Sequence, residues 1–303
     1  MSAAPAVEAI DLVKRFGDNV AVNGVSFQIP TGTIFGLLGP NGAGKTTIVR
    51  MLTTLSRPTS GTGTVAGYDI RTHPEQVRRH MGLTGQAATV DELLTGRENI
   101  RLIGRLYGLP RNYIDELAAE LLTQFSLTDA ADRPAKTYSG GMRRRLDLAV
   151  SLVARPPVLF LDEPTTGLDI DARSTMWKTI RTLVREGCAL VLTTHYLEEA
   201  EALADRVTVL ARGRIVAQGS VQQIRARVAQ RRIRCVSGLA EGAIARWPQV
   251  RSVARDGERL EIITDQVESV TRLLLSEDAA LTDLEIQRAG LAEAFVEITR
   301  EAA

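Results

Sequence analysis

The stretch GPNGAGKTT at residues 39–47 decides the fold of this chain. Its spacing is G-x-x-x-x-G-K-T, in which glycines let backbone N–H groups close around the oxygens of a phosphate. Residues 33–38 before it form a short apolar run typical of a buried strand, and residues 48–52 after it predict a helix. In this order the positive end of the helix dipole points at a bound phosphate. We therefore predict an α/β fold of the P-loop NTPase class.

The residues of this loop have predicted roles in nucleotide binding. The Lys45 ammonium is expected to reach the β- and γ-phosphates of a nucleotide, and the Thr46 hydroxyl to ligate Mg²⁺. The predicted phosphate-binding residues are Gly39, Pro40, Asn41, Gly42, Ala43, Gly44, Lys45, Thr46 and Thr47. The alternative is a chance Gly-Lys-Thr in a glycine-rich turn, and the flanking strand and helix argue against it.

The composition excludes several classes of function. The 303 residues include 37 basic and 36 acidic ones, so the formal net charge of +1 gives no global attraction to nucleic acid. The two cysteines have neither metal-site nor redox spacing. No apolar run approaches the roughly 20 residues that span a bilayer, and we find no signal peptide. We expect a soluble chain, for which any membrane role requires a partner.

Two further apolar strands deliver polar residues to their carboxyl ends. Residues 158–161 read VLFL and are followed by Asp162 and Glu163, while residues 189–194 are followed by His195. An unpaired buried carboxylate costs several kcal/mol, so we expect both acids to face solvent, a cation or a substrate. Ligands of open α/β sheets bind at the carboxyl ends of strands. The pattern predicts Asp162 as a Mg²⁺ ligand, Glu163 as a base and His195 as a functional residue.

The remaining sequence predicts a helical insert and a second domain. Apolar residues recur with helical period over 97–107 and 113–125, within an insert of about 87–155. Ser139 is predicted to cap the last insert helix, and a plain capped helix is the alternative reading. Residues 58–63 predict a turn. We place an ATP-binding domain at 1–220 and a small α+β domain at 221–303, which starts with a basic helix over 221–232 and continues in the order β-α-β-β-α-β of a ferredoxin-like layer.

Taken together, these motifs resemble the ATP-binding subunits of ABC transporters over residues 7 to about 220. Residues 39–46 match the family's Walker A loop, residues 158–162 its Walker B strand, and YSGGM at 138–142 its signature, which is usually LSGGQ. Gln86 matches the Q-loop, Asp169 the D-loop and His195 the switch histidine. Phe16 falls where the family places an adenine-stacking aromatic, usually tyrosine. Two residues depart from the family pattern. Met142 replaces the signature glutamine, and Phe16 cannot hydrogen-bond as a tyrosine would, but its ring can still stack on a base.

The sequence is closer still to the daunorubicin-resistance type of drug-exporter ATPase. The similar segments are TGQ at 84–86, DELLTGREN at 91–99, YSGGMRRRLDLA at 138–149 and LAEAF at 291–295.

The resemblance implies two chains packed head to tail, with ATP held between the loop of one and the signature of the other. Glu163 would act as general base, with His195 and Lys45 also catalytic, and Mg²⁺ would contact Thr46, Gln86 and Asp162. The nucleotide-binding set would further include Phe16, Ser139, Gly140, Gly141 and Asp169.

The resemblance also implies a separate integral-membrane permease, a place at the cytoplasmic side of the membrane, and export of a hydrophobic drug, an antibiotic or a lipid. The alternatives are a soluble ABC ATPase of translation or DNA repair and a regulator that binds ATP without hydrolysing it. Translation-type members usually carry two ATPase halves and repair-type members long coiled coils, neither of which this chain has. An intact Glu163 and His195 argue against the regulator.

Overall fold

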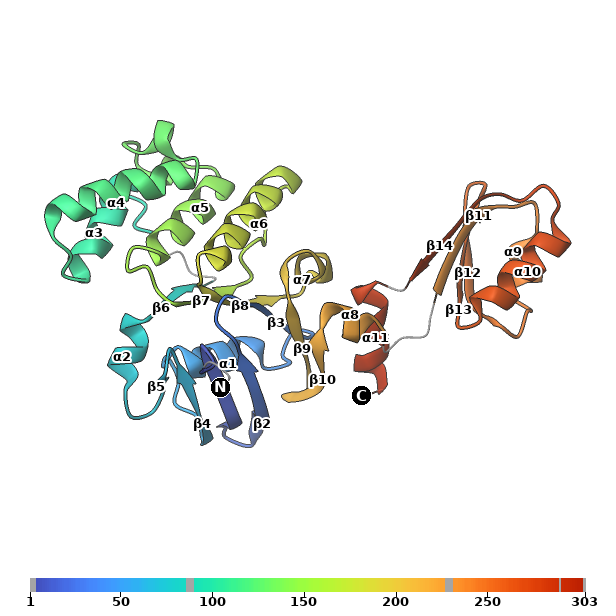
Figure 1. The fold of residues 1–303 in the computed structure, drawn as a ribbon, viewed down its shortest axis with the longest axis horizontal. Coiled ribbons are helices and arrows are strands. Elements are labelled where there is room, and N and C mark those ends of the chain that lie inside the picture. Colours follow the sequence, from blue (N-terminus) through green and yellow to red (C-terminus); the bar gives the residue numbers. More distant parts are fainter. Residues whose placement is uncertain (1–3, 86–89, 227–230, 289, 302–303) are drawn as a thin grey trace. The chain divides into compact units, whose positions relative to one another are not determined.

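The computed structural model describes residues 4–85, 90–226, 231–288 and 290–301 (Figure 1). Contacts divide the chain into two compact units, one that runs to Ser220 and one over Val221–Glu301.

A six-stranded sheet in the order β10-β9-β3-β8-β7-β6 forms the centre of the first unit. Its strands are β3 (Ile34–Leu38), β6 (Met81–Thr84), β7 (Val158–Asp162), β8 (Ala189–Thr194), β9 (Arg206–Ala211) and β10 (Arg214–Ser220). All neighbours pair in parallel except β9 and β10. Leu38 at the end of β3 pairs with Thr194, and Asp162 at the end of β7 pairs with Thr193. The loops after β3, β7 and β8 therefore leave the sheet at the same edge.

A second, antiparallel sheet in the order β2-β1-β4-β5 completes the strands of this unit. Its strands are β1 (Val7–Phe16), β2 (Asn19–Ile29), β4 (Ser60–Val65) and β5 (Tyr68–Asp69). The prediction of a turn over residues 58–63 is wrong from Ser60 onward, because that segment is the start of β4. A Cβ at Gly61 would lie 2.1 Å from the carbonyl oxygen of Asp11 on β1. The glycines that resemble a turn signal are there because two strands approach closely.

Helices lie on both sides of the central sheet. They are α1 (Lys45–Leu52), α2 (Pro74–Arg79), α3 (Gly96–Leu106), α4 (Arg111–Gln124), α5 (Gly140–Ser151), α6 (Ile170–Arg185) and α7 (Leu197–Leu203), with 3₁₀ turns at Thr128–Ala130 and Ala135–Thr137. The segment predicted as a helical insert contains α3, α4 and α5. The sequence predicts a helix over residues 173–186, but α6 begins at Ile170, because Asp169 caps it by accepting the Ala172 N–H at 2.7 Å.

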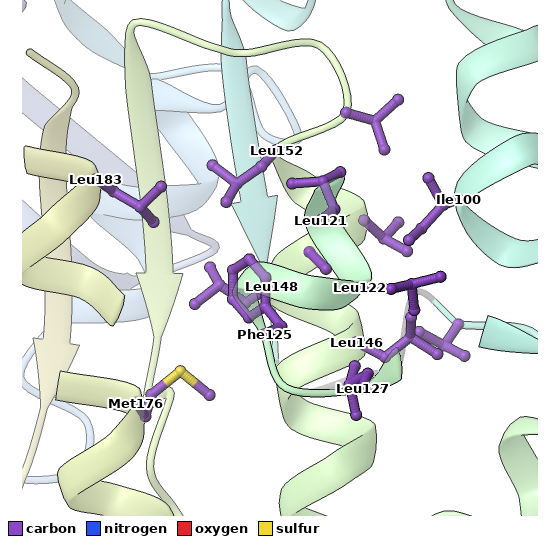
Figure 2. Packing of buried hydrophobic residues seen from close by; sticks show 14 of the residues in the cluster. Ile100, Leu121, Leu122, Phe125, Leu127, Leu146, Leu148, Leu152, Met176 and Leu183 are labelled. Atoms are coloured by element: carbon purple, nitrogen blue, oxygen red, sulfur yellow. The ribbon is translucent and has the colours of Figure 1, made fainter. Parts of the chain in front are cut away.

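The sheet separates two apolar cores because successive side chains of a strand point to opposite faces. Leu159 and Leu161 of β7 belong to the core shared with α4, α5 and α6. Figure 2 shows Leu121, Leu148 and Met176 of these helices in that core. Val158 and Phe160 belong to the other core, which the antiparallel sheet and α1 complete. Helices α3–α6 gather on one side of β6, β7 and β8 (Figure 1). The polar strand ends are thus held on a sheet that is covered on both faces.

The second unit has its own sheet and core. Its elements are α8 (Val221–Ala226), β11 (Arg231–Val236), α9 (Glu241–Ile244), β12 (Val250–Asp256), β13 (Arg259–Thr264), α10 (Val267–Glu277), β14 (Thr282–Arg288) and α11 (Leu291–Glu301). The sheet order is β12-β13-β11-β14 and every neighbouring pair is antiparallel. Helices α9 and α10 pack on one sheet face around Ile233 and Ile262, and α8 contacts α11. This is a split β-α-β layer.

Two helix predictions in this unit need correction. The helix predicted over 221–232 ends at Ala226 within the described residues, and Arg231 begins β11. There Arg231 pairs with Thr264 on one side and Arg288 on the other, so ladder bonding overrides the helical propensity of arginine. The sequence also predicts a helix over residues 241–247, but α9 ends at Ile244.

Candidate active site

The loop between β3 and α1 depends on glycine at two positions. A Cβ at Gly39 would lie 2.6 Å from the carbonyl oxygen of Leu210 and 2.9 Å from the Cβ of Ala43. Gly44 has φ +102°, and a Cβ there would lie 2.6 Å from the carbonyl oxygen of Ala21 on β2. Glycine is thus needed both for the tight turn and for the close approach of the loop to β2 and β9.

Lys45 starts α1 and turns back over the loop. Its side chain is 6% exposed, and Nζ donates to the carbonyl oxygens of Gly39 at 2.7 Å and Pro40 at 3.1 Å. Burial lowers the pKa of the Lys45 ammonium, against the opposing effect of Glu163 and Asp162. The first hydrogen bond of α1 is donated by the Ile48 N–H to the carbonyl oxygen of Gly44 at 2.9 Å. The backbone N–H groups before Ile48 therefore point out of the helix end. A buried cation beside free helix amides is an anion-binding arrangement.

Asp162 closes β7 beside the neighbouring strand β8. It is 6% exposed, and the Thr193 hydroxyl donates to its Oδ1. The parallel register places Asp162 opposite Thr193, which is why the two side chains meet. Thr46 is exposed at the start of α1. Helix α1 follows β3, and β8 lies between β3 and β7, so the hydroxyl and the carboxylate predicted to ligate a cation belong to the two strands that flank β8.

Glu163 has an unusual backbone for a residue with a side chain. Its φ is +53°, in the left-handed region that favours glycine. Its N–H donates to the carbonyl oxygen of Thr193 at 3.0 Å and to its hydroxyl at 3.2 Å. Residues held in such conformations cluster at functional sites. The left-handed turn carries the Glu163 side chain away from the line of β7.

The Glu163 carboxylate meets the histidine that follows β8. Its Oε1 lies 3.1 Å from Nδ1 of His195, and its Oε2 accepts from the Thr166 hydroxyl at 3.3 Å. The Glu163 side chain is 17% exposed and that of His195 39%. The His195 ring lies 4.1 Å from the ring of Tyr196, centre to centre. The structure therefore brings Lys45, Asp162, Glu163 and His195 to the same sheet edge.

The predicted signature begins α5. Ser139 is the N-cap, as predicted, and accepts the Met142 N–H at 3.2 Å. A cavity of about 490 Å³ is lined by Gly140, Glu163, Leu168 and neighbouring residues of α5 and the 166–168 loop. A Cβ at Gly140 would have no atom within 4 Å, whereas a Cβ at Gly141 would lie 3.3 Å from the Cβ of Ala172. Asp169 is exposed, with one oxygen used in capping α6.

Of the remaining predicted site residues, one lies on β1 and one falls outside the described residues. Phe16 ends β1 and is 55% exposed, with Nζ of Lys14 5.0 Å from its ring centre. It is thus not a core aromatic, the ordinary alternative for such a residue. Gln86 lies outside the described residues.

Sequence reasoning missed two residues that hold the acidic pair. Thr193 bonds to both Asp162 and Glu163, and Arg144 of α5 donates to the carbonyl oxygens of both at 3.0 Å. Thr193 was visible as the polar end of an apolar strand. Its partners depend on which strand lies beside β8, and no local pattern specifies that.

Comparisons with known proteins agree with this geometry. Residues 22–166 match the family model described as ABC transporter. The chain is 46% identical over 307 residues to the daunorubicin resistance ATP-binding protein DrrA2 of Streptomyces coeruleorubidus, which covers 97% of this chain and 95% of that protein. The chain belongs to the ABC transporter family.

Other family members extend the likeness. The Nod factor export ATP-binding protein I of Ralstonia nicotianae is 43% identical over 220 residues, covering 73% of this chain and 68% of that protein. A solved ATP-binding subunit of an ABC transporter has a TM-score of 0.67 and 28% identity, covering 73% of this chain and 92% of its own. The chain is therefore an ABC-type ATPase that binds ATP. Relatives named for drug resistance and export favour the exporter class over the soluble translation or repair class.

Proposed function

We propose that this chain is the ATP-hydrolysing subunit of an exporter that moves a hydrophobic drug, an antibiotic or a lipid through a separate membrane permease. The observation that carries the proposal is the meeting of Lys45, Asp162, Glu163 and His195 at one sheet edge. Similarity to a daunorubicin resistance ATP-binding protein over nearly the whole chain supports the drug as the leading cargo class.

Binding of the triphosphate falls to the loop and the start of α1. The loop amides and Lys45 offset the charge of the phosphates, and the buried ammonium exchanges its two carbonyl acceptors for phosphate oxygens. Thr46 and Asp162 would hold Mg²⁺, which neutralises phosphate charge when bound, and we assign Gln86 to the same group. Phe16 offers an exposed ring for stacking on the base. Its neighbour Arg15 pairs with Val20 on β2. The next residue of β2, Ala21, has the carbonyl that Gly44 approaches, which connects this end of β1 to the phosphate-binding loop.

Hydrolysis falls to Glu163 and His195. Glu163 accepts a proton from the attacking water as general base, and the 3.1 Å contact with His195 orients its carboxylate. His195 also contacts the γ-phosphate in this assignment. The carboxylate remains partly exposed, which a base that must reach water requires.

A second copy of the chain completes each site. Ser139, Gly140, Gly141 and Asp169 line the nucleotide of the partner chain, and the exposed helix start of α5 gives them a positive dipole end. The residues of the loop and the signature occur once each in the chain. Two chains packed head to tail therefore form two complete sites.

The permease contacts the helical insert in this proposal, and the subunit is peripheral at the cytoplasmic face. Within the described residues, no helix is both long and apolar enough to span a bilayer. Large apolar side chains are exposed on the insert: Leu93 (75%), Leu102 (41%), Leu106 (74%) and Tyr107 (43%). Leu102 and Leu106 lie one turn apart on α3, and apolar side chains that are exposed together on a folded domain mark a protein interface. We assign residues 221–303 an accessory role without nucleotide chemistry.

The replacement Glu163→Gln tests the proposal. We expect ATP binding to remain and turnover to fall at least ~100-fold, the scale for loss of a general base. Steady-state phosphate release and equilibrium nucleotide binding measure the two quantities. Glu258→Gln, an exposed glutamate in the hairpin of the second unit, serves as the control with unchanged turnover. Wild-type turnover in Glu163→Gln would overturn the assignment of the base.

A further inference from the structure

Three consecutive arginines of α5 point to three different places. Arg143 pairs with Glu92 at 2.7 Å, and Arg145 donates to the carbonyl oxygens of Phe125 and Ser126 at 2.9 and 3.1 Å. Arg144 instead enters the region between the helical insert and the strand ends. The same helix thus supplies a test residue, Arg144, and a neighbouring arginine, Arg145, whose hydrogen bonds go elsewhere.

The Arg144 guanidinium binds four backbone carbonyls. Nε donates to Pro164 at 2.9 Å, Nη1 to Gly85 at 2.8 Å, and Nη2 to both Asp162 and Glu163 at 3.0 Å. Three of these acceptors form one continuous segment, residues 162–164, which includes the cation ligand and the base. The fourth acceptor, Gly85, directly follows β6, the strand that pairs with β7. A planar guanidinium with five N–H donors can make such a set of bonds, and a lysine cannot.

The segment that Arg144 holds contains a strained backbone conformation. Glu163 has φ +53°, a conformation that costs free energy for a residue with a Cβ and persists only where the surroundings enforce it. Two groups enforce it from opposite sides of the residue. Thr193 binds the Glu163 N–H, and Arg144 binds the carbonyl groups of residues 162, 163 and 164. Loss of Arg144 releases the carbonyl side of this turn.

The environment keeps the guanidinium in place without a direct ion pair to the base. Burial lowers the pKa of Arg144, while the carboxylates of Asp147, Asp162, Glu199 and Glu163 oppose that effect. These four acids come from α5, the 162–163 segment and α7, so they surround Arg144 from three elements. Arg144 is therefore a cation in a partly buried acidic site whose direct bonds, as far as the described residues show, go to the backbone.

We propose that Arg144 is a positioning residue for hydrolysis, which holds the left-handed turn at Glu163 and thereby sets the place of its carboxylate relative to the nucleotide. Arg144 does not touch ATP in this assignment. The inference rests on the proposed role of Glu163 as general base. It extends that role by naming what fixes the base in a conformation that the chain does not favour by itself.

The test compares Arg144→Gln, Arg144→Lys and Arg145→Gln in the purified full chain. We expect Arg144→Gln to lower kcat by on the order of 10–100-fold, the cost of a small misplacement of a catalytic group. The KM for ATP and the stoichiometry of bound nucleotide should remain near wild type, because the loop is intact. Arg144→Lys should lie between the two, since an ammonium keeps the charge and cannot span four carbonyls.

Arg145→Gln is the control for stability alone. Arg145→Gln also removes bonds from an α5 arginine to backbone carbonyls, two against the four of Arg144. We therefore expect its Tm to fall, by less than that of Arg144→Gln, while kcat stays within about twofold of wild type. Equal kcat losses in the two variants, or a loss in Arg144→Gln that tracks the fraction of nucleotide-competent protein, would overturn the proposal. If Arg144→Gln fails to fold, Arg144→Lys decides, and wild-type kcat there counts against it. Glu163→Gln, measured in parallel, separates the role of Glu163 as base from the role of Arg144 as its positioning residue. Wild-type turnover in Glu163→Gln would refute the assignment of the base, whatever the Arg144 variants show.

Discussion

Charged side chains are buried to different degrees in two regions of the molecule. The regions are the carboxyl edge of the six-stranded sheet and the four-stranded sheet of the second unit. In the first region Lys45, Asp162 and Glu199 are all at least nine-tenths buried. Among the described residues of the second unit, the buried polar side chains are Ser237 and Thr264. Its charged residues form pairs with substantial exposure, such as Arg234 with Glu261 at 3.0 Å.

The difference indicates which region the fold builds for chemistry. Burying a charge costs several kcal/mol unless partners compensate, so a fold that needs only stability keeps its charges at the surface. The second unit follows that rule. The first unit breaks it at the strand ends, and adds the left-handed Glu163, where the proposed nucleotide chemistry takes place.

The largest expected contrast between the two units comes from adding a carboxylate at a helix start. Gly140 begins α5 and Gly242 lies in the first turn of α9. A Cβ at either position would have no atom within 4 Å, so both have room for a side chain. We expect Gly140→Asp to lower turnover at least ~100-fold, because its carboxylate repels the phosphates of the partner's nucleotide in a desolvated site. Gly242→Asp should leave turnover unchanged. Phosphate release by the two variants gives the comparison.

The same variant also tests the head-to-tail arrangement. Gly140 and Glu163 of one chain line the same cavity, so a site within one chain is the competing hypothesis. At protein concentrations too low for dimers, we expect Gly140→Asp to bind ATP with wild-type affinity. A collapse of affinity under those conditions would assign the signature to its own chain's nucleotide.

A chain that ends at Ser220 probes the division of labour directly. Every residue of the proposed site precedes that point, and the apolar core around Ile233 draws its residues from the second unit. We expect the shortened chain to bind ATP within about threefold of the full chain, measured by equilibrium titration of folded protein. A folded product without ATP affinity would show that the second unit contributes to the site.

The smallest effect concerns one hydrogen-bonded carboxylate in each unit. Burial raises the pKa of Asp69, but hydrogen bonds from Thr62, Thr72 and Arg71 outweigh it and hold the pKa at about 2. A hydrogen bond from the Ser237 hydroxyl, with backbone N–H bonds, likewise lowers the pKa of Asp278. Both ionised groups therefore stabilise the fold above the unfolded pKa of about 3.9, and this stability is lost as pH falls through the folded value.

The replacements Asp69→Asn and Asp278→Asn measure that stability. Each should lower Tm by at most a few degrees at pH 7, and the difference from wild type should shrink from about pH 5 to pH 2. We expect Asp69→Asn to move the unfolding of the first unit and Asp278→Asn that of the second. A Tm difference that stays constant across this range would mean that the carboxylate's charge is not involved.

The degree to which the sequence predicted the structure follows the range of the interactions. The loop, the apolar strands before Asp162 and His195, and the Ser139 cap are local patterns, and the structure confirms these elements. The errors lie where distant contacts override local signals. From the sequence alone Gly61 is typical of a turn, but in the structure it lies in a strand that β1 approaches closely. Arg231 is predicted in a helix, but in the structure it pairs with two neighbouring strands.

The sequence by itself determined the family and led us to propose the site residues, because the spacing of a phosphate-binding loop and of apolar strands is a property of neighbouring residues. Only the tertiary structure decided how these residues meet. Strand β8 lies between β3 and β7, and this order brings Thr193 to Asp162 and His195 to Glu163. Arg144 reaches Gly85 across 59 positions of chain. Such contacts are set by sheet order and helix packing, which no local stretch specifies.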